Sequence, residues 1–112
     1  MKISTHVLDT SIGRPAAGVG VELHRNENGR WTTIVTASTT PDGRVAAFAP
    51  LHAPLEAGEY RLIFDAGAYF RSRGLDTFYD RIQIDFCARD DASHYHVPLL
   101  VSPFGYSTYR GS

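Results

Sequence analysis

Hydrophobic and polar residues alternate along several stretches of this chain. Val19, Val21 and Leu23 alternate with Gly, Glu and His, and the same period of two recurs over residues 60–64 and 82–86. This spacing is typical of strands that are buried on one face, because successive side chains of a strand point in opposite directions. The pattern therefore predicts a protein built from half-buried β-strands.

Turn-forming residues stand between these stretches. They occur at residues 13–15 (Gly-Arg-Pro), 28–29 (Asn-Gly), 41–43 (Pro-Asp-Gly), 57–58 (Ala-Gly) and 103–105 (Pro-Phe-Gly). Each supplies a residue that adopts a positive or a fixed φ, as a chain reversal requires. Strands at intervals of about ten residues with such turns predict an all-β fold, an antiparallel two-sheet sandwich.

One segment departs from the alternating pattern. Residues 65–74 show no period of two, with Asp65 as a helix cap and Gly74 as a stop, so we expect one short helix there. The chain contains no internal repeat, linker or low-complexity stretch. We therefore expect a single domain over residues 1–112.

The C-terminal segment combines alternation with reactive side chains. His94 and His96 fall on one face of a predicted strand, opposite an apolar face of Tyr95, Val97, Leu99 and Val101. A turn at 102–105 should fold residues 106–110 back beside this strand and bring Tyr109, Arg110 and Ser112 toward the histidines. Pro98 cannot donate to a strand ladder, so the strand is either locally irregular or lies at a sheet edge.

Composition excludes several classes of function. Eleven Lys and Arg against twelve Asp and Glu give a net charge of −1, and no stretch concentrates one sign, so we expect neither nucleic acid nor a membrane as a partner. Cys87 is the only cysteine, which excludes an internal disulfide and a multi-cysteine metal site; we expect it to fill the core. The N-terminal residues resemble a strand and lack the apolar region of a signal peptide, so we expect a cytoplasmic protein.

The candidate chemical groups are His6, Arg44, the pair His94 and His96, and the segment Tyr109–Ser112. His6 points outward if Val7 points to the core, and taken alone it reads as a solvated side chain. Three imidazoles could bind zinc, but His-x-His is a loose pattern and no carboxylate follows it at a recognisable spacing, so we expect no metal. A serine-nucleophile triad is disfavoured because no Gly-x-Ser-x-Gly motif is present.

Three segments together resemble a known family. They are Ser4–Val19, the Asp-Gly-Arg of residues 42–44, and His94–Ser112 with its terminal Tyr-Arg-Gly-Ser. They are similar to the transthyretin-related 5-hydroxyisourate hydrolases of urate breakdown. The resemblance implies catalytic roles for His6, Arg44, His96 and Ser112, and substrate binding by His6, Arg44, Tyr109 and Ser112. It also implies a transthyretin-like sandwich of about eight strands.

The same resemblance implies hydrolysis of 5-hydroxyisourate to 2-oxo-4-hydroxy-4-carboxy-5-ureidoimidazoline without a cofactor. It implies a homotetramer, a dimer of dimers, with the sites at the interface between dimers. A neutral imidazole of His96 or His6 could deprotonate the attacking water, and Arg44 could hold the developing oxyanion. The alternatives are a transthyretin-like small-molecule carrier that uses the same channel, and a structural sandwich. A carrier would be marked by inert residues in place of His6, Arg44 and His96.

Overall fold

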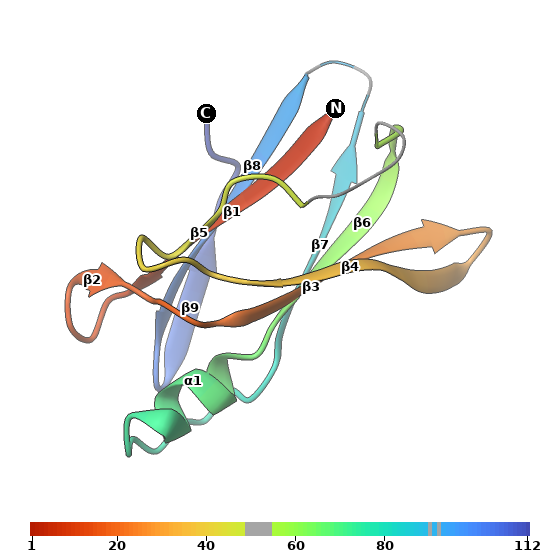
Figure 1. Ribbon diagram of the computed structural model, residues 1–112. Coiled ribbons are helices and arrows are strands. Elements are labelled where there is room, and N and C mark those ends of the chain that lie inside the picture. The colour runs from red at the N-terminus through yellow and green to blue at the C-terminus, as the bar shows by residue number, and fades with distance from the viewer. Residues whose placement is uncertain (49–54, 90, 92) are drawn as a thin grey trace.

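The computed structural model describes residues 1–48, 55–89, 91 and 93–112, which form two packed β-sheets and one short helix (Figure 1). The elements are β1 (Lys2–Asp9), β2 (Arg14–Pro15), β3 (Gly20–Glu27), β4 (Arg30–Ser38), β5 (Arg44–Val45), β6 (Gly58–Phe64), α1 (Ala66–Ser72), β7 (Ile82–Ala88), β8 (His94–Ser102) and β9 (Gly105–Thr108). One sheet has the order β2-β1-β8-β9, with β5 also paired to β1, and the other has the order β4-β3-β6-β7. The predicted two-sheet sandwich is confirmed. The described residues contain nine strands, two of them only two residues long, where about eight were expected.

The core lies between the sheets and uses the apolar positions of the alternating pattern. The side chains with 0–2% exposure include Val21 and Leu23 of β3, Leu62 and Phe64 of β6, and Leu99 and Val101 of β8. Burial of a large aliphatic or aromatic side chain stabilises a fold by about 1.5–3 kcal/mol. The period of two therefore fixes which face of each strand turns inward, and with it which residues are left on the outer faces.

One strand pair runs opposite to the expectation of an all-antiparallel sandwich. β1 and β8 are parallel, in a register that runs from Lys2 opposite His94 to Asp9 opposite Val101, and they lie side by side in Figure 1. A half-buried strand has the same alternation whether its neighbour is parallel or antiparallel, so the sequence pattern carried no sign of this. The parallel pair places the N-terminal strand directly beside the histidines of β8.

Pro98 lies inside the sheet and not at its edge. β8 pairs with β1 on one side and β9 on the other, and the bridges to the C-terminal segment are interrupted between Leu99 opposite Thr108 and His96 opposite Gly111. The Pro98 carbonyl accepts a hydrogen bond from the Thr108 hydroxyl at 2.7 Å. Of the two alternatives left open for this strand, the locally irregular one holds.

The helix forms where the sequence predicted it. The Asp65 carboxylate caps α1 by accepting from the Ala68 amide, and Gly74 follows the helix with a φ of 72°. Tyr69 of this helix donates its hydroxyl to the buried Asp9 carboxylate of β1 at 2.8 Å. Burial and this hydrogen bond raise the pKa of Tyr69 to about 12. The contact ties the helix to the end of β1 that lies away from the N-terminus.

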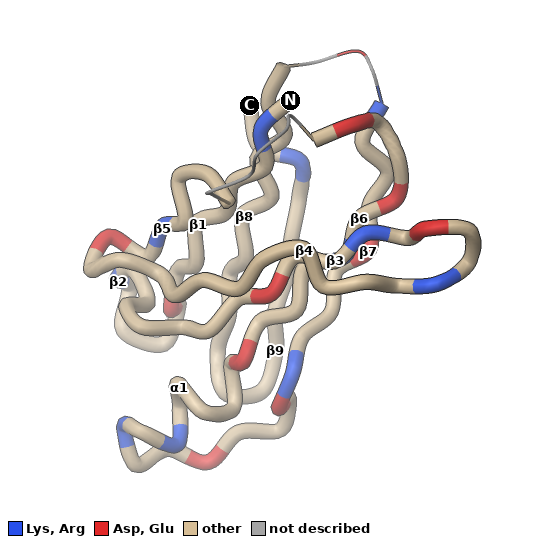
Figure 2. Tube along the Cα trace, turned by 45° about the vertical axis from the view of Figure 1, so that its right-hand side comes forward, with Lys and Arg blue, Asp and Glu red and all other residues tan. Residues whose placement is uncertain are grey.

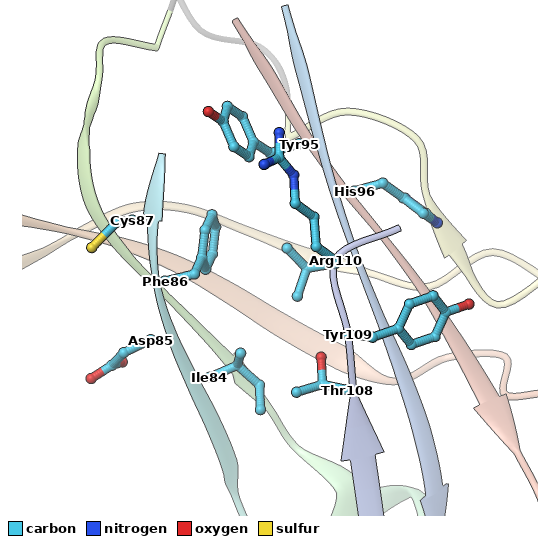
Figure 3. Close-up of a pocket in the computed structure, with 10 residues that line it drawn as sticks. Ile84, Asp85, Phe86, Cys87, Tyr95, His96, Thr108, Tyr109 and Arg110 are labelled. Carbon is cyan, nitrogen blue, oxygen red and sulfur yellow. The ribbon is translucent and has the colours of Figure 1, made fainter. Parts of the chain in front are cut away.

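Cys87 does not fill the core, and this prediction was wrong. The residue is exposed on β7, because Ile82, Ile84 and Phe86 take the inward positions and leave Gln83, Asp85 and Cys87 on the outer face. Figure 3 shows the Cys87 and Asp85 side chains pointing away from the side on which Ile84 and Phe86 lie. The error arose because Cys87 was assigned to the apolar set of its strand although its position is out of phase with that set.

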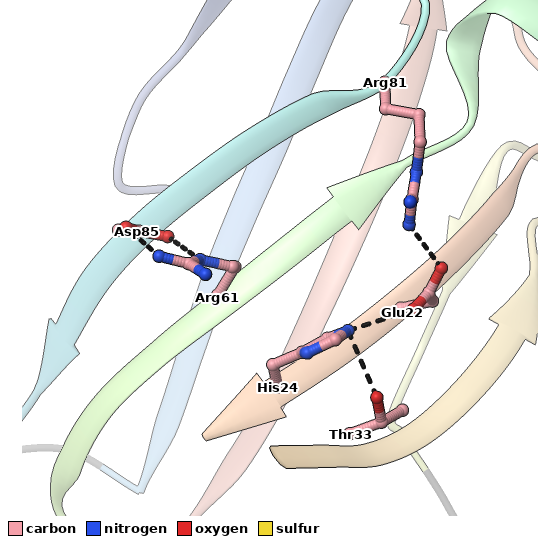
Figure 4. Close-up of polar contacts among 6 residues, drawn as sticks. All are labelled: Glu22, His24, Thr33, Arg61, Arg81 and Asp85. Atoms are coloured by element: carbon pink, nitrogen blue, oxygen red, sulfur yellow. Dashed lines mark hydrogen bonds and ion pairs between the residues drawn. The ribbon is translucent and has the colours of Figure 1, made fainter. Parts of the chain in front are cut away.

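The outer face of the second sheet is covered by charged pairs. Arg61 donates to Asp85 at 2.7 Å, Arg81 donates to Glu22 at 2.7 Å, and His24 contacts Glu22 at 2.9 Å (Figure 4). The bond from Arg61 lowers the pKa of the Asp85 carboxyl. Charges of both signs occur along much of the trace, whereas β8 and β9 carry no Lys, Arg, Asp or Glu (Figure 2). No helix of the described residues is long and apolar enough to cross a membrane.

Candidate active site

The outer face of the first sheet carries the residues that the sequence singled out. His6 of β1 lies opposite Arg44 of β5 on one side and opposite Pro98 of β8 on the other. His96 lies on the same face, two residues before Pro98. The predicted outward orientation of His6 is confirmed, since Val7 is fully buried and His6 is half-buried.

A tight turn delivers Arg44 to this face. Gly43 has a φ of 75°, and a Cβ at this position would stand 2.4 Å from the carbonyl oxygen of Val7. The Val7 amide donates to the Gly43 carbonyl at 2.7 Å, which joins the turn to β1. Only glycine combines this backbone conformation with so close an approach. The Asp-Gly-Arg spacing thus places Arg44 immediately after the contact and opposite His6.

Ser4 connects the two histidines of β8. Its hydroxyl oxygen lies 2.6 Å from Nε2 of His94 and 2.7 Å from Nδ1 of His96. Ser4 is buried, with 3% of its surface exposed, whereas His94 is exposed and His96 is half-buried. The hydroxyl therefore holds both rings on one side of the sheet, with ring centroids 6.2 Å apart.

The C-terminal segment returns along β8, as predicted, and packs on His96. The Gly111 amide donates to the His96 carbonyl at 2.8 Å. A Cβ on Gly111 would stand 2.6 Å from Cδ2 of the His96 ring, so this position accepts no side chain without movement of the ring or the segment. Figure 3 shows His96 and Tyr109 pointing to the same side, while Arg110 extends toward Tyr95. The Arg110 guanidinium lies 4.7 Å from the centre of the Tyr95 ring.

Three of the predicted site residues meet at one hollow. It has a volume of about 260 Å³ and is lined by Ser4, Thr5, Arg44, Ala46, His94, His96 and Ser112. His6 lies next to this hollow, because it is the residue of β1 that is paired with Arg44 of β5. Tyr109 does not line it and is 58% exposed; it borders, with His96, a second hollow of about 250 Å³ between β7 and the C-terminal segment. A single chain therefore gathers Arg44, His96 and Ser112 with His6 beside them, whereas Tyr109 lines the neighbouring hollow.

Electrostatics favour a neutral His96. Burial lowers the pKa of this imidazole, and the nearby charges of His94, Arg44 and His6 lower it further. His6 is held differently, because its Nε2 lies 2.9 Å from the carbonyl oxygen of Asp42. A carbonyl oxygen only accepts, so Nε2 of His6 carries the proton in that bond. Among the described residues, the ring nitrogen without a hydrogen-bond partner is therefore Nε2 in His96 and Nδ1 in His6.

The three-imidazole zinc site is not assembled in this geometry. The nitrogens of His94 and His96 that face each other both contact the Ser4 hydroxyl. Across the part of the chain that the structure describes, no group of three or more His, Cys, Asp or Glu side chains is placed to hold a metal ion.

Comparison with known proteins identifies the family of the chain. A profile described as the HIUase/Transthyretin family matches residues 3–111. The chain belongs to this family. A 5-hydroxyisourate hydrolase of Salmonella typhimurium is 47% identical over 110 residues, which cover 98% of this chain and 80% of the relative. The profile match covers the first two segments on which the resemblance rested and all of the third except Ser112.

Solved structures of the HIUase/Transthyretin family agree with the fold. The structure of Klebsiella pneumoniae 5-hydroxyisourate hydrolase is 44% identical, with a TM-score of 0.87 over all of both chains. Sea bream transthyretin in complex with thyroxine is 30% identical, with a TM-score of 0.90 over 99% of this chain and 95% of that one. The hydrolase and the transthyretin therefore share this sandwich, and the fold alone does not distinguish a hydrolase from a carrier.

Two residues of the site were missed by sequence reasoning. The sequence singled out Ser4 only as the first residue of the segment Ser4–Val19, and Gly111 only as part of the terminal Tyr-Arg-Gly-Ser. The signal for Ser4 was its phase, since it alternates with Ile3 and Thr5 in the same way as His6. Its contact with His94 and His96 depends on the parallel pairing of β1 and β8, which the sequence did not disclose.

Proposed function

We propose that this chain catalyses the hydrolysis of 5-hydroxyisourate to 2-oxo-4-hydroxy-4-carboxy-5-ureidoimidazoline, a step of urate degradation. One observation carries the proposal: a half-buried imidazole, His96, shares a hollow with the cationic Arg44 and the hydroxyl-bearing Ser112. The family and a relative that is 47% identical and named 5-hydroxyisourate hydrolase support the same reaction.

His96 is the general base in this proposal. The substrate contains a reactive acyl–nitrogen bond in a six-membered ring, and water must attack its carbonyl carbon. A base must be unprotonated before it accepts the proton of that water, and burial lowers the pKa of His96 below its ordinary value. The proton then passes from His96 to the departing ring nitrogen. His6, whose Nε2 donates to Asp42, orients substrate through its remaining nitrogen.

Arg44 supplies positive charge where negative charge develops. Attack by water turns the substrate carbonyl oxygen into an oxyanion, and a guanidinium is always charged and donates in a fixed fork. The Gly43 turn fixes the backbone of Arg44 beside β1 and opposite His6, so the guanidinium is tethered at the hollow that His96 lines. Ser112 lines the same hollow and Tyr109 lines the second hollow, which His96 also borders; their hydroxyls are suited to orienting substrate or water. No step requires a cofactor.

The assembly proposed is a homotetramer, a dimer of dimers, with each site at the interface between dimers. The hollow is open on the outer face of the sheet, and Tyr109 is 58% exposed, so one chain alone does not enclose a substrate. Phe78, Tyr79 and Tyr106 form an exposed aromatic cluster, with Tyr79 edge-on to the other two rings, and Phe104 is exposed as well. Exposed apolar clusters of this kind are typical of subunit contacts. Sedimentation at equilibrium should give four times the chain mass.

Mixing the protein with freshly made 5-hydroxyisourate tests the function. The ultraviolet absorbance of the substrate should decay faster than it does spontaneously, in proportion to enzyme concentration. The reaction is expected in the cytoplasm, where an exposed thiol such as Cys87 stays reduced. A transthyretin-like carrier would instead bind an aromatic ligand such as thyroxine and leave the decay unchanged. The carrier is disfavoured because His6, Arg44 and His96 are charged or titratable, where a carrier would have inert residues.

A further inference from the structure

Ser4 occupies a position that constrains where the protons of two histidines lie. Its hydroxyl oxygen lies 2.6 Å from Nε2 of His94 and 2.7 Å from Nδ1 of His96, so both contacts are within hydrogen-bond distance. A hydroxyl has a single proton, and it can donate to only one of the two rings at a time. It must therefore accept a hydrogen bond from the other ring.

Two arrangements satisfy both contacts. In the first, Ser4 donates to Nδ1 of His96, and His94 donates its Nε2 proton to Ser4; neutral His96 then carries its proton on Nε2. In the second, Ser4 donates to Nε2 of His94, and His96 donates its Nδ1 proton to Ser4; Nε2 of His96 is then a free lone pair. Only the second arrangement leaves the outward nitrogen of His96 able to accept a proton.

The surrounding charges favour the second arrangement. Lys2 and His6 of β1 and Arg44 of β5 are the groups of basic character that border the two rings from neighbouring strands, and Tyr109 adds a hydroxyl from the C-terminal segment. Arg44 lines the hollow with His96 and only donates hydrogen bonds. A positive charge beside a ring stabilises an unprotonated nitrogen over an N–H group. Within the described residues, Ser4 is the one hydrogen-bond partner of the His96 ring.

We propose that Ser4 is a positioning residue that holds His96 with its proton on Nδ1, and so keeps Nε2 free as the base, by donating its own proton to His94. The proposal rests on the hydrolysis proposed above. It assigns a role to His94: Nε2 of His94 accepts the hydrogen bond from the Ser4 hydroxyl, so Ser4 does not donate to His96. Among the described residues that line the hollow, Ser4 is the one whose side chain touches both rings.

The same link makes the two histidines share one added proton. When Nε2 of His96 takes a proton from water, its Nδ1 proton can pass to the Ser4 oxygen while the Ser4 proton passes to Nε2 of His94. His96 is then neutral with its proton on Nε2, His94 is the cation, and the charge has moved without a net change in protons. A second added proton would place N–H groups on both sides of one oxygen and two positive charges close together. The lowered pKa of His96, to which the charge of His94 contributes, is in keeping with this coupling.

The test compares the full-length protein with its Ser4→Ala variant by nitrogen NMR of histidine-labelled samples. Ring nitrogen shifts distinguish an N–H from a bare nitrogen, so they report the tautomer of His96 without any turnover. The parent should show His96 protonated on Nδ1, and Ser4→Ala should show a mixture of tautomers. The rate constant kcat/KM of the variant should fall roughly tenfold, the loss expected when about one hydrogen bond to the ring is removed. Ser102→Ala, on β8 with the two histidines but with its hydroxyl donating to the Gly105 carbonyl, should change neither.

A second variant separates positioning from a structural role. In His94→Ala the Ser4 hydroxyl remains but has lost its acceptor, so it should turn to His96 and move the ring proton to Nε2. The double variant should then be no slower than the slower single variant, since both changes break one link. Parental His96 protonated on Nε2, an unchanged tautomer in Ser4→Ala, or losses that multiply in the double variant would each overturn the proposal. A parent without hydrolase activity would refute the proposed function, while the tautomer would still be read.

Discussion

Replacement of Gly111 by alanine should move the His96 ring by a distance that the structure sets. An added Cβ would stand 2.6 Å from Cδ2 and 3.2 Å from Cγ of this ring, and 3.2 Å from Cγ of Pro98. Carbon atoms that do not repel each other sit about 3.5 Å apart or more, so the ring or the C-terminal segment must give way by roughly 0.9 Å. The Gly111 amide is bonded to the His96 carbonyl at 2.8 Å, which limits the movement of the segment. The ring is therefore expected to move.

A displacement of this size acts on catalysis more than on folding. A misplacement of a reacting group by about 1 Å costs on the order of 100-fold in rate, so kcat/KM for 5-hydroxyisourate should fall by that factor. Gly111 does not have a positive φ, so alanine does not strain its backbone. The melting temperature should therefore change little.

The assay is the ultraviolet decay of fresh substrate, with folding checked by circular dichroism. Gly105→Ala is the matched control in the same hairpin, because its Cβ would meet only the Ser102 oxygen at an ordinary 3.8 Å and its φ is not positive. Gly105→Ala should keep the parental rate. A Gly111→Ala variant that is folded and hydrolyses substrate at the parental rate would refute the reasoning that this close packing positions His96.

Four further predictions concern the same face. His96→Ala and His6→Ala should each fold and should slow turnover, which rate measurements on both variants check. Loss of the base His96 should cost roughly 100- to 10,000-fold, and loss of His6, which orients substrate, should cost on the order of 100-fold. The acid limb of kcat/KM against pH should lie below about 6.5, the ordinary histidine value, because the lowered pKa of His96 keeps it unprotonated to a lower pH; a limb above that value would exclude His96 as the base. Activity should survive exhaustive dialysis against a chelator, and a loss that zinc restores would revive a metal site. Deletion of residues 109–112 should abolish turnover while circular dichroism still shows the sandwich; full activity would show that Tyr109 and Ser112 take no part.

The sequence predicted those structural features that are set within a single strand, turn or helix. Alternation located the inward residues of β3 and β6, such as Leu23 and Leu62, because burial of one face is a property of each strand alone. The turn at Asn28-Gly29 and the helix after Asp65 were predictable for the same reason, since positive φ and helix capping are local requirements. The outward orientation of His6 and His96 followed from the same phase.

The relations between strands could not be read in this way. The parallel pairing of β1 and β8 has no local signature, and it is this pairing that brings Ser4 to His94 and His96. The resemblance to a family supplied candidate residues but did not indicate which nitrogens they leave free. Cys87 was misplaced for a simpler reason, because its residue type was weighed above its phase in the strand.

The division between core and outer face explains how one sandwich serves different chemistry. The apolar set of each strand is fixed by packing between the sheets, whereas His6, Arg44 and His96 lie on the other side of the first sheet and contribute little to that packing. Sea bream transthyretin, crystallised with thyroxine, keeps nearly the same backbone at 30% identity. The fold therefore tolerates wide change, and the chemistry of this chain must be argued from its outward residues. Gly43 and Gly111 contribute to that chemistry, because the close approach of Gly43 to the Val7 carbonyl and of Gly111 to the His96 ring sets where Arg44 and His96 lie.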